Sequence, residues 1–233
     1  MFWTFVDRSQ LVGGQVIFEG PQAHHLARVL RVRPGERGIA VSTGREYEVE
    51  VVTAEGDRVV ARVLDNRPAH GEPRIHIALL QAILPNPDFD AVIEGGTAVG
   101  ISRFIAVQAE RSIARPDASR RQRWQLIAES AAEQSHRGAI PVVTGPTTLA
   151  EALDREVQQS RLVVLDPGAA RSLASAANGA EAYSLAVGPE GGWSDTELAM
   201  MRDRGAVAVN LGPRILRARL APIVAAAILV QQS

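Results

Sequence analysis

From residue 74 onward, short apolar runs alternate along the chain with segments of helical character. The run at 74–83 is almost continuously hydrophobic, and the strands predicted at 102–108 and 161–166 likewise lack the polar residue at every second position that marks a half-exposed strand. Further strands are predicted at 183–187 and 207–211, with helices at 88–99, 119–135, 149–157, 195–204 and from about 219 onward. Apolar strands separated by helices are typical of a parallel sheet covered on both faces. The sequence therefore predicts an α/β domain over 74–233.

The first seventy residues carry a different pattern. Tyr47, Val49 and Val51 alternate with glutamates, which indicates an antiparallel strand at 46–52 with one buried face. The other predicted elements are strands at 38–42 and 58–64 and a helix at 22–32 that stops before Pro34-Gly35. The polar segment 66–73, rich in proline and glycine, separates this region from the next. We therefore expect a small β-barrel domain over 1–70.

A glycine-rich turn, Gly-Pro-Glu-Gly-Gly at 188–192, links the strand 183–187 to a helix that Ser194 would cap. Glycines let the backbone approach a ligand closely, and the first amides of the helix point at the same place. The turn lacks the Gly-Lys-Ser/Thr of a P-loop and the glycine spacing of a dinucleotide fingerprint. By itself the motif fits a ligand site and a ligand-free strand–helix turn equally well.

A second turn of the same kind follows some twenty residues later. The strand 207–211 ends in Gly212-Pro213, after which Arg214 and Arg217 flank an Ile-Leu pair. In open α/β sheets, ligands bind in the crevice outside the carboxyl ends of the strands. Two such turns in succession therefore favour a binding site over a purely structural turn.

The two turns together resemble the paired signature of the ribosomal RNA small-subunit methyltransferase E family, within the SPOUT superfamily of trefoil-knotted methyltransferases. Three further stretches resemble motifs of that family: Glu-Arg-Ser at 110–112, Glu-Gln-Ser-His-Arg at 133–137 with Ile140-Pro141, and the His- and Arg-containing segment 24–31 with Pro34-Gly35. The resemblance covers nearly the whole chain and both domains in order.

The resemblance implies a PUA-like RNA-binding β-barrel over 1–70 and a knotted parallel-sheet domain over 74–233. The knot loops would hold S-adenosyl-L-methionine (SAM). The residues that the resemblance assigns to this donor are Leu165, Gly188, Pro189, Gly191, Gly192, Leu211, Gly212, Ile215 and Leu216. The family is homodimeric, with the active site typically at the dimer interface. The expected partners are therefore 16S rRNA, or the small ribosomal subunit, and a second copy of the chain.

The reaction implied is methylation of N3 of a specific uridine in 16S rRNA. The sulfonium of the donor is already a strong electrophile, so no metal is expected. The enzyme must position N3 and stabilise the charge that develops when the imide proton leaves. The expected catalytic candidates are Arg217, Arg137, Gln134 and Glu190, each of which could instead give structural support.

RNA contact is expected at the end of the first helix, at His25, Arg28, Arg31 and Arg33. A solvated helix face would show the same run of charges. The formal net charge is only −1, but the chain contains no lysine, and the planar guanidinium of arginine can grip a phosphate in two places.

Composition narrows the remaining possibilities. The absence of cysteine excludes disulfides and a Cys-built zinc site. The N-terminus lacks the pattern of a signal peptide, and the apolar run at 220–230 falls short of the roughly 20 residues that span a bilayer. We therefore expect a cytoplasmic protein without membrane attachment.

The chain departs from the family pattern at three places. Arg219 stands where the family usually has Glu, and Gly95 and Ala98 replace a Lys and a Glu. Gly95 and Ala98 lie in the helix predicted at 88–99. The basic residues that the family usually has just before this helix are also missing from 84–88. These departures leave open a methyltransferase with another RNA target, or a non-catalytic RNA-binding homologue.

Overall fold

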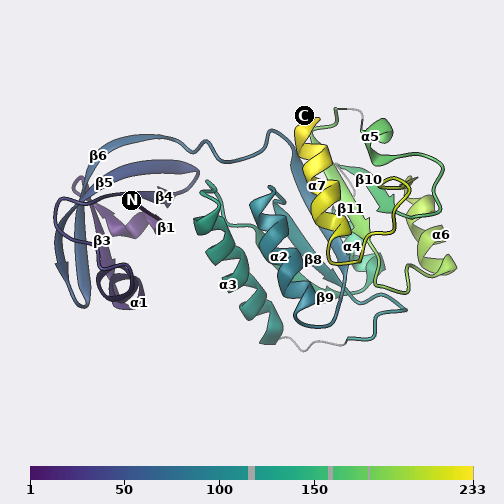
Figure 1. Cartoon of the computed structure of the whole chain (residues 1–233), viewed down its shortest axis with the longest axis horizontal. Helices are drawn as coiled ribbons and strands as arrows, with labels where there is room; N and C mark the ends of the chain where they lie inside the picture. Colours follow the sequence, from purple (N-terminus) through teal and green to yellow (C-terminus); the bar gives the residue numbers. More distant parts are fainter. Residues whose placement is uncertain (115–118, 157–159, 178, 233) are drawn as a thin grey trace. The chain divides into compact units, whose positions relative to one another are not determined.

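The computed structural model describes residues 1–114, 119–156, 160–177 and 179–232 (Figure 1). The chain packs into two units. The first comprises Met1–Glu72 and Ala132–Ala139, and the second comprises Pro73–Ala131 and Ile140–Ser233. A division near residue 72 agrees with the sequence pattern. The assignment of Ala132–Ala139 to the first unit depends on tertiary contacts, which no local pattern reveals.

The first unit contains a six-stranded sheet with the order β1-β4-β5-β6-β3-β2. The strands are β1 (Phe2–Phe5), β2 (Leu11–Val12), β3 (Gln15–Glu19), β4 (Arg37–Ser42), β5 (Arg45–Glu55) and β6 (Arg58–Pro68). β1 pairs with β4 in parallel and the other pairs are antiparallel, so the three strands predicted between 38 and 64 are present as neighbours in one sheet. β1, β2 and β3 are additional strands. They are short and lie toward the sheet edges: β1 and β3 pair with the distant strands β4 and β6, and β2 pairs with β3 across a tight turn.

The helix expected at 22–32 is shorter and of two kinds. An α-helical turn, α1 (Gly20–His24), continues into a π-helical segment, η2 (His25–Val29), and Arg31 follows with a positive φ of 56°. In this stretch Ala23 and Leu26 are buried in the core of the first unit, and Ala27 packs against it. The prediction of one continuous helix to residue 32 was therefore wrong, because the wider turn and the left-handed residue end it early.

The second unit contains six parallel strands with the order β12-β10-β11-β7-β8-β9. They are β7 (His76–Ala82), β8 (Arg103–Val107), β9 (Val142–Thr147), β10 (Arg161–Leu165), β11 (Ala182–Val187) and β12 (Val207–Val209). The predicted parallel sheet is confirmed. β9 was not predicted because Gly145-Pro146 interrupts its pattern; β9 is an edge strand, where a proline is tolerated.

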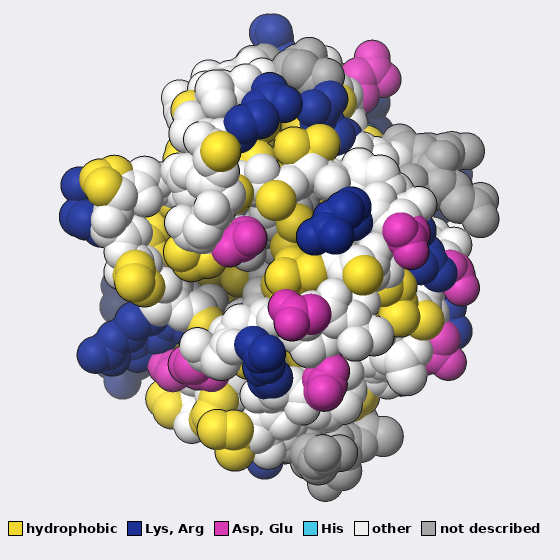
Figure 2. All heavy atoms as spheres, turned by 90° about the vertical axis from the view of Figure 1, so that its right-hand side faces the viewer, with side chains coloured by type: hydrophobic (Ala, Val, Ile, Leu, Met, Phe, Trp, Pro, Cys, Tyr) yellow, Lys and Arg dark blue, Asp and Glu magenta, His cyan; other side chains and the backbone are white. Residues whose placement is uncertain are grey.

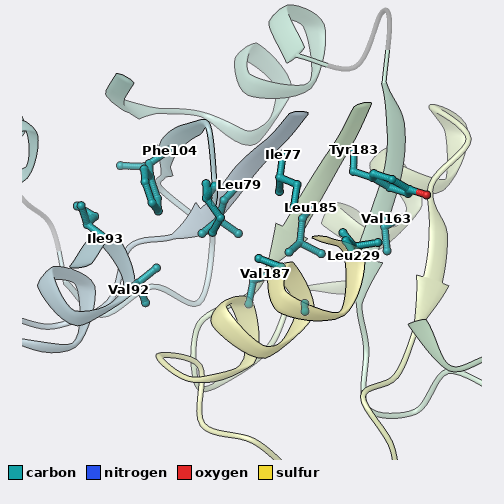
Figure 3. Packing of buried hydrophobic residues seen from close by; sticks show 14 of the residues in the cluster. Ile77, Leu79, Val92, Ile93, Phe104, Val163, Tyr183, Leu185, Val187 and Leu229 are labelled. Atoms are coloured by element: carbon teal, nitrogen blue, oxygen red, sulfur yellow. The ribbon is translucent and has the colours of Figure 1, made fainter. Parts of the chain in front are cut away.

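Helices cover both faces of this sheet. They are α2 (Asp88–Ala98), α3 (Ser119–Gln134), α4 (Leu149–Glu156), α5 (Leu173–Ala176), α6 (Asp195–Asp203) and α7 (Ala221–Gln231). Neighbouring strand residues point to opposite faces, so Leu79 packs in the cluster under α2 and α7 whereas Leu80 packs in the cluster under α4 and α6. Figure 3 shows the first cluster, with Leu229 of α7 close to side chains of the central strands. Burial on both faces explains why these strands read as continuous apolar runs.

The glycine pair in α2 lets two helices approach closely. A Cβ built on Gly95 would lie 2.6 Å from Cδ1 of Ile223 in α7, and one on Gly96 would lie 2.8 Å from the ring of Phe104. The place of a side chain at Gly95 is therefore taken by Ile223. This packing accounts for the Gly95 departure in this chain.

Within the described residues, no helix is both long and apolar enough to cross a bilayer. The same residues contain no cluster of His, Cys, Asp and Glu side chains that could hold a metal ion.

Candidate active site

A cavity of about 460 Å³ opens at the carboxyl edge of the parallel sheet in the second unit. Its walls come from the chain after β10, the glycine-rich turn after β11 and the segment before α7. The lining residues are Asp88, Leu165, Pro167, Val187, Gly188, Pro189, Glu190, Gly192, Trp193, Ile215, Leu216, Arg217, Ala218, Arg219 and Ala221. A volume in this range is typical of small-molecule sites.

A smaller pocket of about 130 Å³ shares five lining residues with this cavity: Leu165, Pro167, Ile215, Leu216 and Ala221. Its other walls include Asn210, Leu211, Gly212, Pro213 and Arg214. Of the nine residues predicted to hold the donor, eight line one or both spaces: Leu165, Gly188, Pro189, Gly192, Leu211, Gly212, Ile215 and Leu216. Gly191 lines neither space; its carbonyl oxygen accepts a hydrogen bond from Arg111.

The glycine-rich turn folds back on its own main chain. A Cβ on Gly188 would lie 3.2 Å from the Gly192 carbonyl carbon and the Trp193 nitrogen. Gly192 has a φ of 70°, which favours glycine, and its amide donates to the Pro189 carbonyl at 2.9 Å. The wall that this turn gives the cavity is therefore made largely of backbone.

Arg111 and Glu197 brace this turn from outside the cavity. Arg111 Nη1 donates to the carbonyl oxygens of Gly191 at 3.0 Å and Trp193 at 3.2 Å. The Glu197 carboxylate accepts from the Glu110 amide at 2.9 Å and the Ser194 amide at 2.8 Å. The Glu-Arg-Ser turn after β8 thus holds the glycine-rich turn after β11. The sequence pointed to this turn, but its role was missed.

An ion pair lies at the wall of the cavity. Arg219 Nη1 is 2.9 Å from Oδ1 of Asp88, the first residue of α2. Both side chains line the cavity and are partly exposed. Asp88 was not among the predicted site residues, and the one signal that could have pointed to it is its place at the end of the segment 84–88, which lacks the family's usual basic residues.

The four catalytic candidates fall in different units. Arg217 and Glu190 line the cavity of the second unit, whereas Gln134 and Arg137 belong to the first. Arg137 is 2% exposed and forms a two-point ion pair with Glu72, at 3.0 Å from Nε and 2.6 Å from Nη2. Glu72 also accepts from the amides of Gly138 and Ala139, so this arginine has a structural function in the chain. Gln134 is exposed.

The residues predicted to contact RNA lie on η2 and the loop after it. His25, Arg28, Arg31 and Arg33 are all exposed. Val29 and Leu30, between them in the chain, are 60% and 48% exposed. Exposed apolar and basic side chains together form a surface suited to a polyanion that also presents flat bases.

The indole of Trp193 adds a polar group at the cavity wall. Its Nε1 is buried and has no hydrogen-bond acceptor among the described residues. The apolar side chains of Leu165, Val187 and Leu216 with this indole fit a ligand that has a flat heterocycle, and the backbone of the glycine-rich turn fits its polar part. Figure 2 shows the side on which α6 lies in Figure 1, where basic and acidic side chains surround a hollow with hydrophobic side chains.

Comparison with known proteins points to one family. A family model described as an RNA methyltransferase domain matches residues 71–230, and one described as an RNA methyltransferase PUA domain matches residues 18–64. The ribosomal RNA small subunit methyltransferase E of Mycobacterium tuberculosis is 35% identical over 231 residues, which cover 95% of this chain and 88% of that protein. That of Synechocystis is 31% identical, over 95% of this chain and 75% of its own length.

A solved structure agrees with these sequence matches. The structure of a ribosomal RNA small subunit methyltransferase E from Neisseria gonorrhoeae bound to S-adenosyl methionine superposes with a TM-score of 0.92 at 30% identity. The match covers 100% of this chain and 98% of that one.

Proposed function

Because the chain belongs to the ribosomal RNA small subunit methyltransferase E family, we propose that it transfers a methyl group from SAM to N3 of a uridine in 16S rRNA of the small ribosomal subunit. The observation that carries the proposal is the cavity formed by the two glycine turns, in a chain that matches a SAM-bound relative over its whole length. A ribosomal substrate would place the enzyme in the cytoplasm.

The turn 188–192 and the segments around Leu165 and Leu216 would hold the donor. When bound, SAM supplies a methyl group on an electrophilic sulfonium. The apolar side chains would enclose its adenine, and the backbone amides and carbonyls of the turn would satisfy its polar groups. Arg111, Glu197 and Ser194 would keep that backbone in place before the donor arrives.

Arg217 and Glu190 are the side chains of the cavity that we assign to the acceptor uridine. As the N3 proton leaves, negative charge spreads onto the two uracil oxygens. Arg217, exposed at the cavity, would stabilise this charge, and Glu190 would contact the base edge. We keep Gln134 as a candidate contact to the base, and we assign Arg137 to the support of that segment through Glu72.

The proposed assembly is a homodimer that holds RNA through the first unit. His25, Arg28, Arg31 and Arg33 would contact phosphates, which position the RNA without reading its sequence. The knotted path of the cavity loops remains part of this proposal.

A methyl-transfer assay tests the proposal, with labelled SAM as the donor and small ribosomal subunits that lack their natural methylation as the acceptor. Nucleoside mass spectrometry should detect 3-methyluridine, and Arg217→Ala should lower the rate about 10²- to 10³-fold while donor binding persists. A different methylated nucleoside would identify another RNA target.

A non-catalytic RNA-binding protein is the second candidate function, and the feature that favours it is a sequence departure, the arginine at 219 where the family usually has Glu. Calorimetric titration with SAM separates the two candidates. A folded chain that binds RNA but neither binds SAM nor transfers methyl groups would establish the non-catalytic role.

A further inference from the structure

The first unit has a pocket of its own, which is lined by none of the residues assigned so far. Its volume is about 530 Å³. It is formed by the 3₁₀ turn after β1, the β2–β3 turn, the β4–β5 turn and the facing parts of β5 and β6. The lining residues are Arg8, Leu11, Gly14, Gln15, Thr43, Arg45, Tyr47, Val63 and Asn66.

The pocket carries positive charge that nothing in its lining offsets. Two arginines, Arg8 and Arg45, line it, and none of the lining residues is acidic. Five other arginines of this unit, though not Arg28, Arg31 and Arg33, have carboxylate partners among the described residues: Arg37, Arg58, Arg62, Arg67 and Arg137. Arg8 and Arg45 have no such ion pair among the described residues, and Arg45 donates to the neutral side-chain oxygen of Asn66. Two guanidinium groups without counter-charges at one hollow suit a phosphate.

The rest of the lining suits the base of a nucleotide. Tyr47 is half-buried, and Leu11 and Val63 provide further apolar surface beside it. Gln15 and Asn66 bring amide groups that can donate and accept hydrogen bonds. Proteins that bind single-stranded RNA commonly stack a base on an aromatic ring and hold the adjoining phosphate with arginine.

We propose that this pocket binds one nucleotide of single-stranded RNA, with its phosphate at Arg8 and Arg45 and its base against Tyr47. The site lies on different elements from η2, so it would be a second point of attachment for the RNA. The identification of the ligand as RNA rests on the proposed function. The charge and shape of the pocket do not depend on it.

The test uses the full chain and a fluorescein-labelled single-stranded 12-nucleotide RNA, with binding followed by anisotropy over a range of salt. The double variant Arg8→Ala/Arg45→Ala should bind at least tenfold more weakly. The slope of log affinity against log salt should fall by about 0.7 for each phosphate contact that is lost. Tyr47→Leu keeps apolar packing but removes the ring, and should weaken binding at least about fivefold.

The matched control is Arg58→Ala/Arg62→Ala, which removes two exposed arginines of the same sheet that already have carboxylate partners. This control should change the affinity less than twofold. Thermal unfolding checks that every variant is folded. If the double variant is not folded, the single variant Arg8→Glu, at an exposed position, replaces it in the binding measurement.

The inference would be overturned if the double variant and its control lost RNA affinity equally, or if neither lost any. Competition by uridine monophosphate at millimolar concentration would support a one-nucleotide site, whereas inorganic phosphate competing equally well would refute a role for the base. A wild-type chain that binds the RNA through this pocket but transfers no methyl group would overturn the proposed function alone.

Discussion

Arg219 and Asp88, 131 positions apart in the sequence, form an ion pair of 2.9 Å at the wall of the cavity. In the family that the chain resembles, an acidic residue is usual at the position of Arg219, and basic residues are usual in the segment that corresponds to 84–88. The departure at Arg219 therefore contacts Asp88, which belongs to the segment where the basic residues are missing. Seen in the structure, Arg219 has a partner and is no longer by itself a sign of lost activity.

Reversing one charge of this pair should disturb the donor site. Arg219→Glu places two carboxylates at the cavity wall, and we expect the dissociation constant for SAM, measured by calorimetry, to rise about tenfold, equivalent to about 1.4 kcal/mol. The exchange Asp88→Arg/Arg219→Glu should restore most of the affinity. The free energy of unfolding should change by less than about 1 kcal/mol, since both side chains are partly exposed.

Arg204→Glu is the control, because it breaks a comparable ion pair, with Asp154, outside the cavity lining. Donor affinity should stay unchanged there. If the double exchange bound SAM no better than Arg219→Glu alone, the pair would have no part in shaping the cavity.

Removing the brace at Arg111 should loosen the glycine-rich turn. Arg111→Ala deletes charge-assisted hydrogen bonds to the carbonyls of Gly191 and Trp193, each worth about 1.5–3 kcal/mol when fully formed. Because the side chain is exposed, we expect a tenfold to thirtyfold loss of SAM affinity rather than the full sum. Hydrogen exchange of the amides at 188–194 should become faster. Arg103→Ala, which removes an arginine of β8 that pairs with Glu156, should leave both measurements as in the wild type.

The two glycines of α2 should respond differently to substitution by alanine. At Gly95 the new Cβ meets the mobile tip of Ile223, and combining Gly95→Ala with Ile223→Val should gain up to about 1 kcal/mol from helix propensity. At Gly96 the Cβ meets the ring of buried Phe104, and overpacking should lower the free energy of unfolding by about 1–3 kcal/mol. Urea unfolding measures the free energy of unfolding of both variants. Equal changes at Gly95 and Gly96 would contradict this account of the helix contact.

Arg137→Ala should act on stability more than on chemistry. The substitution leaves the Glu72 carboxylate without its arginine, so we expect a loss of about 2 kcal/mol or more in the free energy of unfolding. Arg137→Lys should recover only part of it, because one ammonium cannot make the two-point contact. A variant of unchanged stability whose methyl transfer falls a hundredfold would instead show a catalytic function for Arg137.

Glu46 should make the first unit sensitive to acid. Burial acts to raise the pKa of this carboxyl, but the His70 amide, Arg67 and the His70 imidazole together outweigh burial and lower the pKa. A lowered pKa means that the stabilisation is fully present above the unfolded-state pKa, about 4.3, and is lost as the pH falls through the folded-state value. Glu46→Gln should therefore destabilise the unit at pH 7 and lose this disadvantage under acid conditions. Hydrogen exchange of the β5 amides, corrected for intrinsic rates, measures the stability of the unit in the wild type and in Glu46→Gln. If the difference between the two proteins were the same at pH 7 and pH 3.5, this account of Glu46 would be contradicted.

Much of the second unit could be predicted because its signals are local. Strands that are buried on both faces need apolar residues at consecutive positions, so they can be recognised in the sequence. The glycine-rich turns mark the loops that line the cavity. What was missed depends on partners far along the chain. The local sequence around Asp88 does not show that this residue contacts Arg219, and that around Arg111 does not show its contact with the Gly191 carbonyl. Likewise, β9 is recognisable as a strand only through its pairing with β8.

The carboxylate of Glu197 accepts hydrogen bonds from two loops at once, from Glu110 after β8 and from Ser194 after β11. Such a shared acceptor makes the two loops energetically coupled: a ligand that shifts one alters the affinity of any ligand held by the other. By thermodynamic linkage the effect is equal in both directions. RNA bound near the Glu-Arg-Ser turn would therefore change SAM affinity by the same factor by which SAM changes that of the RNA.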